Sequence, residues 1–294
     1  MPSLFKRVAF LWRAPRWYSW HLLLRKFGVR RVQTERDGKT FVVPLSSPGG
    51  VQLVRPFESW WGPLLRKLLP ATTGTFVDVG ANVGQTLLWL RSMDEDRPWL
   101  GFEPSENSCR TVRALIECNS FRNTELIEAG LSDAAGSGVL YAGGGTDSSA
   151  TMIRDFSGEL ASQQELAMQV RLLCAAELMD QQFAAQVGIV KIDVEGMELE
   201  VLRGLQPVFE RDRPILIVEV IPTPDDGSDR SRRMLQRQED LTSYVHSMRY
   251  RLAQIQPDAR LLDVDAPRND VGLEWSNYCA MPDERYEEIR ALFG

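Results

Sequence analysis

A glycine-containing turn is the first stretch of this sequence whose residue types could do chemistry. Residues 76–84 read FVDVGANVG, so an apolar run leads directly into Asp78, Gly80, Asn82 and Gly84. The apolar run predicts a buried strand, and the glycines allow the sharp turn and close backbone approach that a bound cofactor needs. A helix beginning after Gly84 would direct its unpaired N–H groups at that cofactor. We therefore expect a cofactor to be held at this turn.

The same turn indicates which cofactor is held. Dinucleotide-binding proteins place G-x-G-x-x-G around a pyrophosphate, whereas the spacing here is Gly80-x-Asn82-x-Gly84 and the fingerprint fails. Asp78 adds a carboxylate, which repels a phosphate but suits a cofactor with an ammonium group and a sulfonium charge. We therefore expect S-adenosylmethionine and a methyl-transfer reaction. A nicotinamide-dependent oxidoreductase and a turn of structural importance alone are the alternatives.

Acidic residues follow the next two predicted strands. Glu103 comes about 20 residues after the turn, the usual offset of a carboxylate that accepts the ribose hydroxyls of an adenosine cofactor. Ser132 and Asp133 follow the third strand, where Asp133 could accept a hydrogen bond from the exocyclic amine of adenine. Serine and aspartate are also common in turns, so the latter pair has a structural alternative.

A second group of acidic residues follows the strand predicted over residues 188–192. Asp193 and Glu195 come directly after it, and Glu219 ends the next strand along the chain. In open α/β sheets, ligands bind beyond the carboxyl ends of the strands. Asp193 and Glu195 are therefore placed to contact the acceptor substrate or the methionine end of the cofactor.

The proton of an acceptor hydroxyl needs a base, because an alcohol is a poor nucleophile. The chain has two histidines, His21 and His246, and neither lies in a recognisable motif. We therefore hypothesise that Asp193 or Glu195 accepts that proton. Several carboxylates at one sheet edge could bind Mg²⁺, but carboxylates beside a sulfonium need no metal to explain them, and we expect none.

The elements that must position these residues alternate along the chain. Strands are expected near residues 75–79, 99–102, 125–129, 169–173, 188–192, 215–220, 251–255 and 277–281, with helices after most of them. Alternation predicts a doubly wound, mostly parallel sheet, and the last two strands, joined by a loop, predict an antiparallel pair. A β-hairpin is expected over residues 38–55. Residues 1–70 form an N-terminal basic helical segment with this hairpin, and residues 71–294 form the main domain.

Charge is unevenly distributed along the 294 residues. The net charge is −6, but residues 1–31 hold eight basic and no acidic side chains, so subtracting these eight leaves −14 on the remainder. An acidic body argues against nucleic-acid binding. The basic, tryptophan-bearing segment could lie on an anionic membrane or pack as a helical lid. We find no signal peptide and no membrane span, and expect a cytoplasmic chain with peripheral contact at the inner membrane face as an option.

Four stretches together resemble the FkbM family of methyltransferases. They are VDVGANVG at residues 77–84, FEP at 102–104, LSD at 131–133 and KIDVEG at 191–196. The resemblance spans residues 75–220 in the right order. It implies a class I methyltransferase fold, Rossmann-like with seven strands of which the last is antiparallel. It also implies S-adenosylmethionine as donor and O-methylation of a hydroxyl.

The resemblance also assigns residues by motif position. Asp78, Gly80, Asn82, Gly84 and Glu103 correspond to donor contacts, with Ser132 and Asp133 less firmly placed, while Asp193 and Glu195 match the later acidic motif. Members of the family act on natural products, sugars and glycans, and of these we expect a sugar or glycan acceptor, with a small molecule as the alternative. A non-catalytic donor-binding protein is the second alternative. Residues 1–70 and 225–294 lie outside the match and are expected to select the acceptor.

Overall fold

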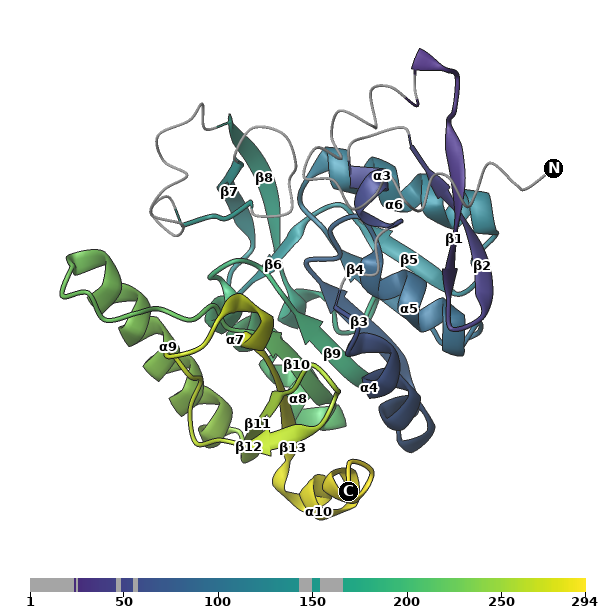
Figure 1. Ribbon diagram of the computed structural model, residues 1–294. Coiled ribbons are helices and arrows are strands. Elements are labelled where there is room, and N and C mark those ends of the chain that lie inside the picture. Colours follow the sequence, from purple (N-terminus) through teal and green to yellow (C-terminus); the bar gives the residue numbers. More distant parts are fainter. Residues whose placement is uncertain (1–23, 25, 46–48, 55–57, 143–149, 154–165) are drawn as a thin grey trace.

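One large sheet forms the centre of the molecule (Figure 1). The computed structural model describes residues 24, 26–45, 49–54, 58–142, 150–153 and 166–294. The eight strands of this sheet lie in the order β12 (Leu261–Asp263), β11 (Tyr250–Ile255), β13 (Asn277–Pro282), β10 (Ile215–Glu219), β9 (Val187–Ile192), β3 (Thr75–Val79), β4 (Trp99–Phe102) and β5 (Thr124–Ile127). Strands β10, β9, β3, β4 and β5 are parallel.

The last strand of the chain runs against its neighbours. β13 is inserted between β10 and β11 and pairs with both in antiparallel fashion. This confirms the doubly wound, mostly parallel sheet with an antiparallel last strand. The short β12, antiparallel to β11, adds one edge strand to the seven that were expected.

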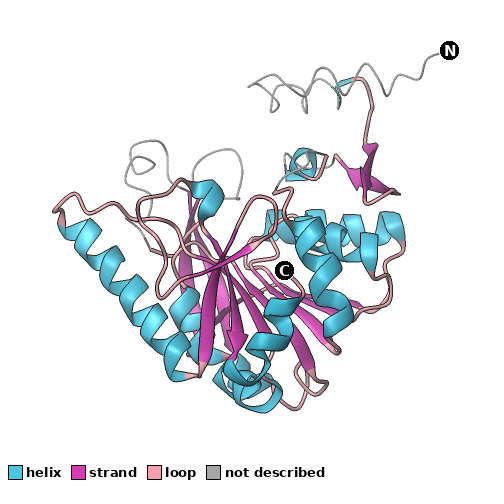
Figure 2. Ribbon diagram, turned by 60° about the horizontal axis from the view of Figure 1, so that its bottom comes forward, coloured by secondary structure: helices cyan, strands magenta, loops and turns pink. Residues whose placement is uncertain are grey.

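Helices cover both faces of the sheet (Figure 2). One face packs against α4 (Trp61–Leu68), α5 (Gln85–Met93), α6 (Glu106–Asn119) and α10 (Tyr286–Ala291), and the other against α7 (Glu198–Gly204), α8 (Gln206–Asp212) and α9 (Asp229–Ser247). Short 3₁₀ turns occupy η1 (Leu69–Ala71), η4 (Ala175–Leu178), η5 (Leu273–Trp275) and η6 (Asp283–Arg285). No helix in the described ranges combines the length and apolarity needed to cross a membrane.

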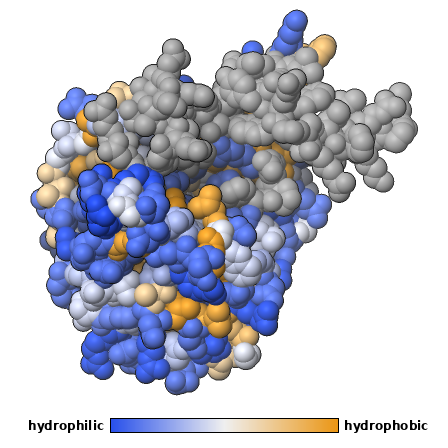
Figure 3. Space-filling model, turned by 60° about the vertical axis from the view of Figure 1, so that its left-hand side comes forward, coloured by the Kyte–Doolittle hydropathy of each residue, from blue (hydrophilic) through white to orange (hydrophobic). Residues whose placement is uncertain are grey.

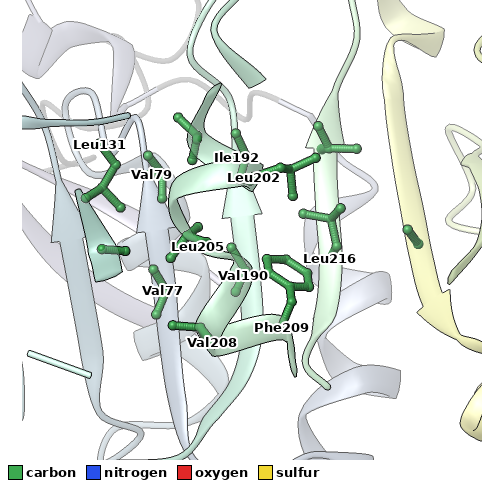
Figure 4. Close-up of a cluster of buried hydrophobic side chains, with 14 of the residues drawn as sticks. Val77, Val79, Leu131, Val190, Ile192, Leu202, Leu205, Val208, Phe209 and Leu216 are labelled. Atoms are coloured by element: carbon green, nitrogen blue, oxygen red, sulfur yellow. The ribbon is translucent and has the colours of Figure 1, made fainter. Parts of the chain in front are cut away.

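The strands bury both of their faces, which explains their continuous apolar runs. Phe76 lies in the core under α4 and α5, while its neighbour Val77 lies in the core under α7 and α8, because successive strand residues point to opposite faces. Figure 4 shows the second of these cores, where Val190 and Leu216 of the sheet meet Phe209 of α8. Because helices pack on both faces of the sheet, they hold in place the edge at which the parallel strands end.

The expected hairpin over residues 38–55 is wrong in its position. The hairpin consists of β1 (Arg31–Arg36) and β2 (Lys39–Pro44), and the expected second strand is instead the short helix α3 (Gly49–Gln52). Asp37 and Gly38 both have positive φ, of 48° and 76°, as a two-residue hairpin turn requires. The hairpin therefore turns at this Asp-Gly pair and not at the Ser-Ser-Pro-Gly-Gly run of residues 46–50, of which residues 46–48 lie outside the described residues. Residues 1–23 and 25 of the basic segment lie outside them as well.

A second, three-stranded sheet stands beside the first. It consists of β6 (Gly130–Ser132), β8 (Leu166–Cys174) and β7 (Gly136–Ala142), in that order. The strand expected at residues 169–173 therefore belongs to this sheet, not to the central one. Gln169 and Arg171 are exposed, whereas Val170 between them is buried, which is the pattern of a half-exposed strand. On the side of the molecule that bears α9, hydrophilic residues dominate the surface, with separate apolar patches between them (Figure 3).

Candidate active site

The glycine turn joins β3 to α5, as its sequence predicts. Gly80, Asn82 and Gly84 have positive φ values of 77°, 47° and 92°, and Gly84 is the N-cap of α5. A Cβ atom at Gly80 would lie 1.9 Å from the backbone oxygen of Asp193, so no other residue fits there. The turn after β3 and the loop after β9 are therefore in direct contact, which brings the two sequence motifs together at one sheet edge.

Glu103 lies beside this turn at the end of β4. Its side chain is buried, and Oε2 accepts a hydrogen bond from the backbone N–H of Asn82 at 2.8 Å. Oε1 accepts a hydrogen bond from the backbone N–H of Ser105, also at 2.8 Å. These two bonds fix the orientation of the carboxylate, and the expected neighbourhood of Glu103 and the glycine turn is present.

Lys191 connects the glycine turn to the acidic loop. Its buried ammonium donates a hydrogen bond to the carbonyl oxygen of Gly80 at 2.7 Å. It also lies 3.2 Å from Oδ1 of Asp78 and 3.3 Å from Oδ2 of Asp193. Burial lowers the pKa of Lys191, but the two carboxylates outweigh burial and raise it well above its usual value. Lys191 therefore remains positively charged and joins the two motifs.

Asp78 lies deeper than its motif position suggests. Its side chain is fully buried, and Oδ2 accepts a hydrogen bond from Trp99 Nε1 at 3.3 Å. Burial raises the pKa of the Asp78 carboxyl, and the charge of Lys191 opposes that rise. The described contacts of Asp78 thus tie it to Lys191 and Trp99, and its direct contact with a cofactor stays a prediction.

Three carboxyl groups meet at the ends of β9 and β10. One oxygen each from Asp193, Glu195 and Glu219 lies within 4.8 Å of the other two. The sequence places these residues at one edge, and the structure brings them together there. Such a group could hold a cation, either the ammonium of a cofactor or a divalent metal ion. The expectation that no metal is bound stays a prediction.

Two of these three carboxyl groups, those of Glu195 and Glu219, bind protons more tightly than free carboxylates do. Burial raises the pKa of Glu195 to about 8, with further contributions from the charges of Asp193 and Glu198. Burial and the charge of Asp193 also raise the pKa of Glu219 well above its usual value, although the hydroxyl of Ser276, which donates to Oε1 at 2.6 Å, lowers it. A positively charged ligand at this edge would relieve the repulsion among these groups.

The sequence interpretation missed Glu58 and did not treat Lys191 as a site residue. Glu58 precedes α4, accepts a hydrogen bond from Trp61 Nε1 at 2.8 Å, and lies 3.5 Å from Nδ2 of Asn277. Burial and the charge of Asp193 raise its pKa to about 7. No local pattern marks Glu58, whereas Lys191 has a signal, because it is the one charge in an otherwise apolar strand.

Ser132 and Asp133 lie at the end of β6. Ser132 is buried and its hydroxyl donates a hydrogen bond to Oδ1 of Asp133 at 3.2 Å, while the side chain of Asp133 is exposed. α7 packs closely against this end: a Cβ atom at Gly204 would lie 2.1 Å from the backbone oxygen of Ser132. The contact of this pair with an adenine ring stays a prediction.

The fold and site together define a class of protein. Class I methyltransferases have a mostly parallel sheet in which an antiparallel strand is inserted next to an outer parallel strand, as β13 lies next to β10 here. They also have a glycine turn and a carboxylate at the ends of two neighbouring strands, as at the ends of β3 and β4. The model of the methyltransferase FkbM domain matches residues 78–252, and the chain belongs to this family. It is therefore a methyltransferase with S-adenosylmethionine as its cofactor, which removes the nicotinamide-dependent alternative.

Solved structures of other methyltransferases are similar to this chain. Methyltransferase FkbM from Methylobacillus flagellatus KT is 16% identical with a TM-score of 0.43, and the match covers 71% of this chain and 43% of that one. The O-methyltransferase from Bacillus cereus in complex with SAH is 13% identical, with coverages of 77% and 80% and a TM-score of 0.43. Precorrin-6y C5,15-methyltransferase from Geobacter metallireducens GS-15 is 13% identical, with coverages of 75% and 85% and a TM-score of 0.38. No curated protein matches the chain.

Proposed function

We propose that this chain transfers a methyl group from S-adenosylmethionine to a hydroxyl oxygen of a sugar or glycan. The contact between Gly80 and the Asp193 backbone supports the proposal most directly, because it puts the donor turn and the acidic edge side by side. When bound, the cofactor supplies a methyl group that its sulfonium already activates. The protein must then align the acceptor oxygen with that methyl group and exclude water.

The residue types around the turn suit the proposed cofactor. Gly80 and Gly84 allow the left-handed backbone of the turn, the backbone N–H of Asn82 orients the carboxylate of Glu103, and that carboxylate would accept the ribose hydroxyls. Ser132 and Asp133 would contact the adenine ring. The acidic edge would attract the ammonium and sulfonium charges, while Lys191 keeps the turn and the Asp193 loop in register.

Asp193 is the group we propose to accept the acceptor's proton. Its side chain is 38% exposed, so an acceptor hydroxyl can reach it. Burial raises the pKa of Glu195 to about 8, so its carboxyl holds a proton at neutral pH and can serve as a base only after a nearby positive charge has lowered that pKa and the proton has left to solvent. Glu195 is therefore proposed to take part beside Asp193, orienting the acceptor by donating or accepting hydrogen bonds.

Asp193→Asn tests this assignment. Calorimetry with S-adenosylmethionine, with NAD as the negative control, measures donor binding. Transfer of label from S-[methyl-³H]adenosylmethionine into an extract of cells that lack this protein measures turnover. We expect donor affinity to fall by no more than about fivefold, because one partly exposed carboxylate contributes at most about 1 kcal/mol to holding a cation, and turnover to fall by about 100-fold, the usual contribution of a general base. Unchanged turnover would remove Asp193 from the role, and donor binding without any transfer by the wild-type chain would favour the non-catalytic alternative.

The acceptor and the location are proposed from the sequence. A glycan hydroxyl agrees with the habits of the family, and the eight basic side chains in residues 1–31 would suit a lipid-linked glycan at the inner membrane face. Mass spectrometry of glycans from cells with and without the protein tests the acceptor, and equal methylation would contradict it. Flotation with anionic vesicles of the intact and 1–31-deleted chains tests the membrane contact, and equal recovery would contradict it.

A further inference from the structure

The backbone that presents Glu195 is unusual. Glu195 has φ of +53° and Gly196 has φ of +107°, so two consecutive residues of the loop that follows β9 have positive φ. A residue with a side chain avoids this region, and it persists there only when the surrounding structure determines it. The contacts of the Glu195–Gly196 peptide should therefore reveal what holds the Glu195 carboxylate in place.

Both ends of this peptide group are hydrogen-bonded, and each by a different element. The backbone carbonyl oxygen of Glu195 accepts a hydrogen bond from Oγ1 of Thr151 at 2.6 Å, and the backbone N–H of Gly196 donates one to Oε1 of Glu198 at 2.8 Å. The next carbonyl oxygen, of Gly196, accepts from Nη2 of Arg237 in α9 at 2.8 Å. Rotation of the peptide plane would break the first two bonds together.

Thr151 is itself firmly held. Its backbone exchanges hydrogen bonds with Tyr141 at the end of β7, at 2.8 and 3.0 Å, and its residue is 5% exposed. Its Oγ1 also accepts a hydrogen bond from the N–H of Ile153 at 3.1 Å. Because the Thr151 hydroxyl accepts the bond from Ile153 through its oxygen, its single hydrogen is still available to donate to the backbone carbonyl oxygen of Glu195. Thr151, which is paired with β7 of the small sheet, thus ties that sheet to the Glu195 loop through its hydroxyl.

We infer that Thr151 is a positioning residue for methyl transfer, which fixes the Glu195–Gly196 peptide and with it the direction of the Glu195 carboxylate. The inference rests on the proposed function, because it assumes that Glu195 meets the acceptor. Thr151 lies 44 residues before Glu195 and outside the motifs. Its bond acts on the acidic loop and leaves the described contacts of Gly80 and Glu103 untouched, so donor binding should survive its loss.

The test compares Thr151→Val, which keeps the shape and removes the hydroxyl, with Thr151→Ser, which keeps the hydroxyl. Thr72→Val is the matched control, because Thr72 is also buried and donates to a backbone oxygen, of Leu68 at 2.9 Å, on helix α4. Calorimetry with S-adenosylmethionine gives donor affinity. Initial rates of tritiated methyl transfer into the extract, at varied donor concentration, give turnover and the KM for the donor.

We expect Thr151→Val to lower turnover by about 5- to 20-fold, as expected for a lost buried hydrogen bond and a misplaced group, with the donor KM and Kd within about twofold of wild type. Thr151→Ser should stay within about threefold of wild-type turnover, and Thr72→Val should match wild type. Wild-type turnover in Thr151→Val, or equal losses in the Val and Ser variants, would overturn the inference alone. A wild-type chain that binds the donor and transfers nothing would overturn the proposed function and this inference with it.

Discussion

Gly80 offers the sharpest test of how the donor turn meets the acidic loop, because Gly38 provides a matched control. The two glycines have nearly the same φ, 77° and 76°. A Cβ atom at Gly38 would meet nothing within 4 Å, whereas one at Gly80 would lie 1.9 Å from the Asp193 oxygen. Gly38→Ala therefore reports the cost of a left-handed alanine alone, and Gly80→Ala reports that cost together with the overlap.

The expected magnitudes follow from these two contributions. A left-handed alanine costs about 1 kcal/mol, so Gly38→Ala should lower the free energy of unfolding by about that amount. Overpacking against backbone adds about 1–3 kcal/mol, so Gly80→Ala should lower it by about 2–4 kcal/mol. Relief of the overlap must move the Asp193 loop, and we therefore expect Gly80→Ala to bind the donor at least about 10-fold more weakly than wild type. Gly38→Ala should bind the donor as tightly as wild type.

Urea unfolding and calorimetry with S-adenosylmethionine measure the two quantities on the same samples. Equal unfolding free energies for the two variants would show that the turn and the Asp193 loop are not in contact. Wild-type donor affinity in Gly80→Ala would show that this contact does not shape the donor site. Either result would contradict a donor site that is built on the contact between Gly80 and the Asp193 backbone.

Further predictions concern the donor, the protons and the metal. Glu103→Gln should weaken donor binding by about 10- to 100-fold in calorimetry, since it removes charge-assisted bonds to the ribose, whereas Glu106→Gln, on a residue whose side chain is 77% exposed, should not. Burial in the folded state raises the pKa of Glu195 to about 8 and that of Glu58 to about 7, so the folded chain holds protons that the unfolded chain releases. Proton binding therefore stabilises the folded state at low pH, and this contribution is lost as the pH rises through those pKa values. Urea unfolding of the donor-free protein should therefore show stability falling between about pH 5 and 8, and Glu195→Gln should flatten the slope; an unchanged slope would argue against a buried, protonated Glu195. Tritiated methyl transfer should persist after exhaustive EDTA treatment, and its loss, restored by Mg²⁺, would assign a metal to the three-carboxyl group.

Local sequence was enough to predict the parts of the site that depend on strand ends. Apolar runs such as β9 mark strands buried on both faces, and parallel strands end at one edge, so Asp193 and Glu219 were expected to meet. The positive φ of Gly80 and Gly84 and the proximity of Glu103 to the turn follow from residue type and spacing. These features are fixed by local rules and by the topology of the sheet.

Other features depend on contacts between distant segments and left no such signal. Glu58 reaches the site only because α4 packs on the sheet next to Asn277, more than 200 residues away in the chain. The inward position of Asp78 depends on its pairing with Lys191. The small sheet depends on the pairing of β7 with β8, across segments that gave no strand pattern beyond alternation in β8. Tertiary packing, rather than local propensity, decides each of these.

The reaction that we propose for this chain is methylation of a hydroxyl of a sugar or glycan. The most direct measurement is tritium transfer from S-[methyl-³H]adenosylmethionine into the carbohydrate fraction of an extract from cells that lack the protein, followed by mass spectrometry of the labelled product. We expect label on an O-methylated sugar with the wild-type chain, and about 100-fold less of it with Asp193→Asn. Label only in molecules that carry no O-methylated sugar, or equal label with both chains, would contradict the proposed reaction.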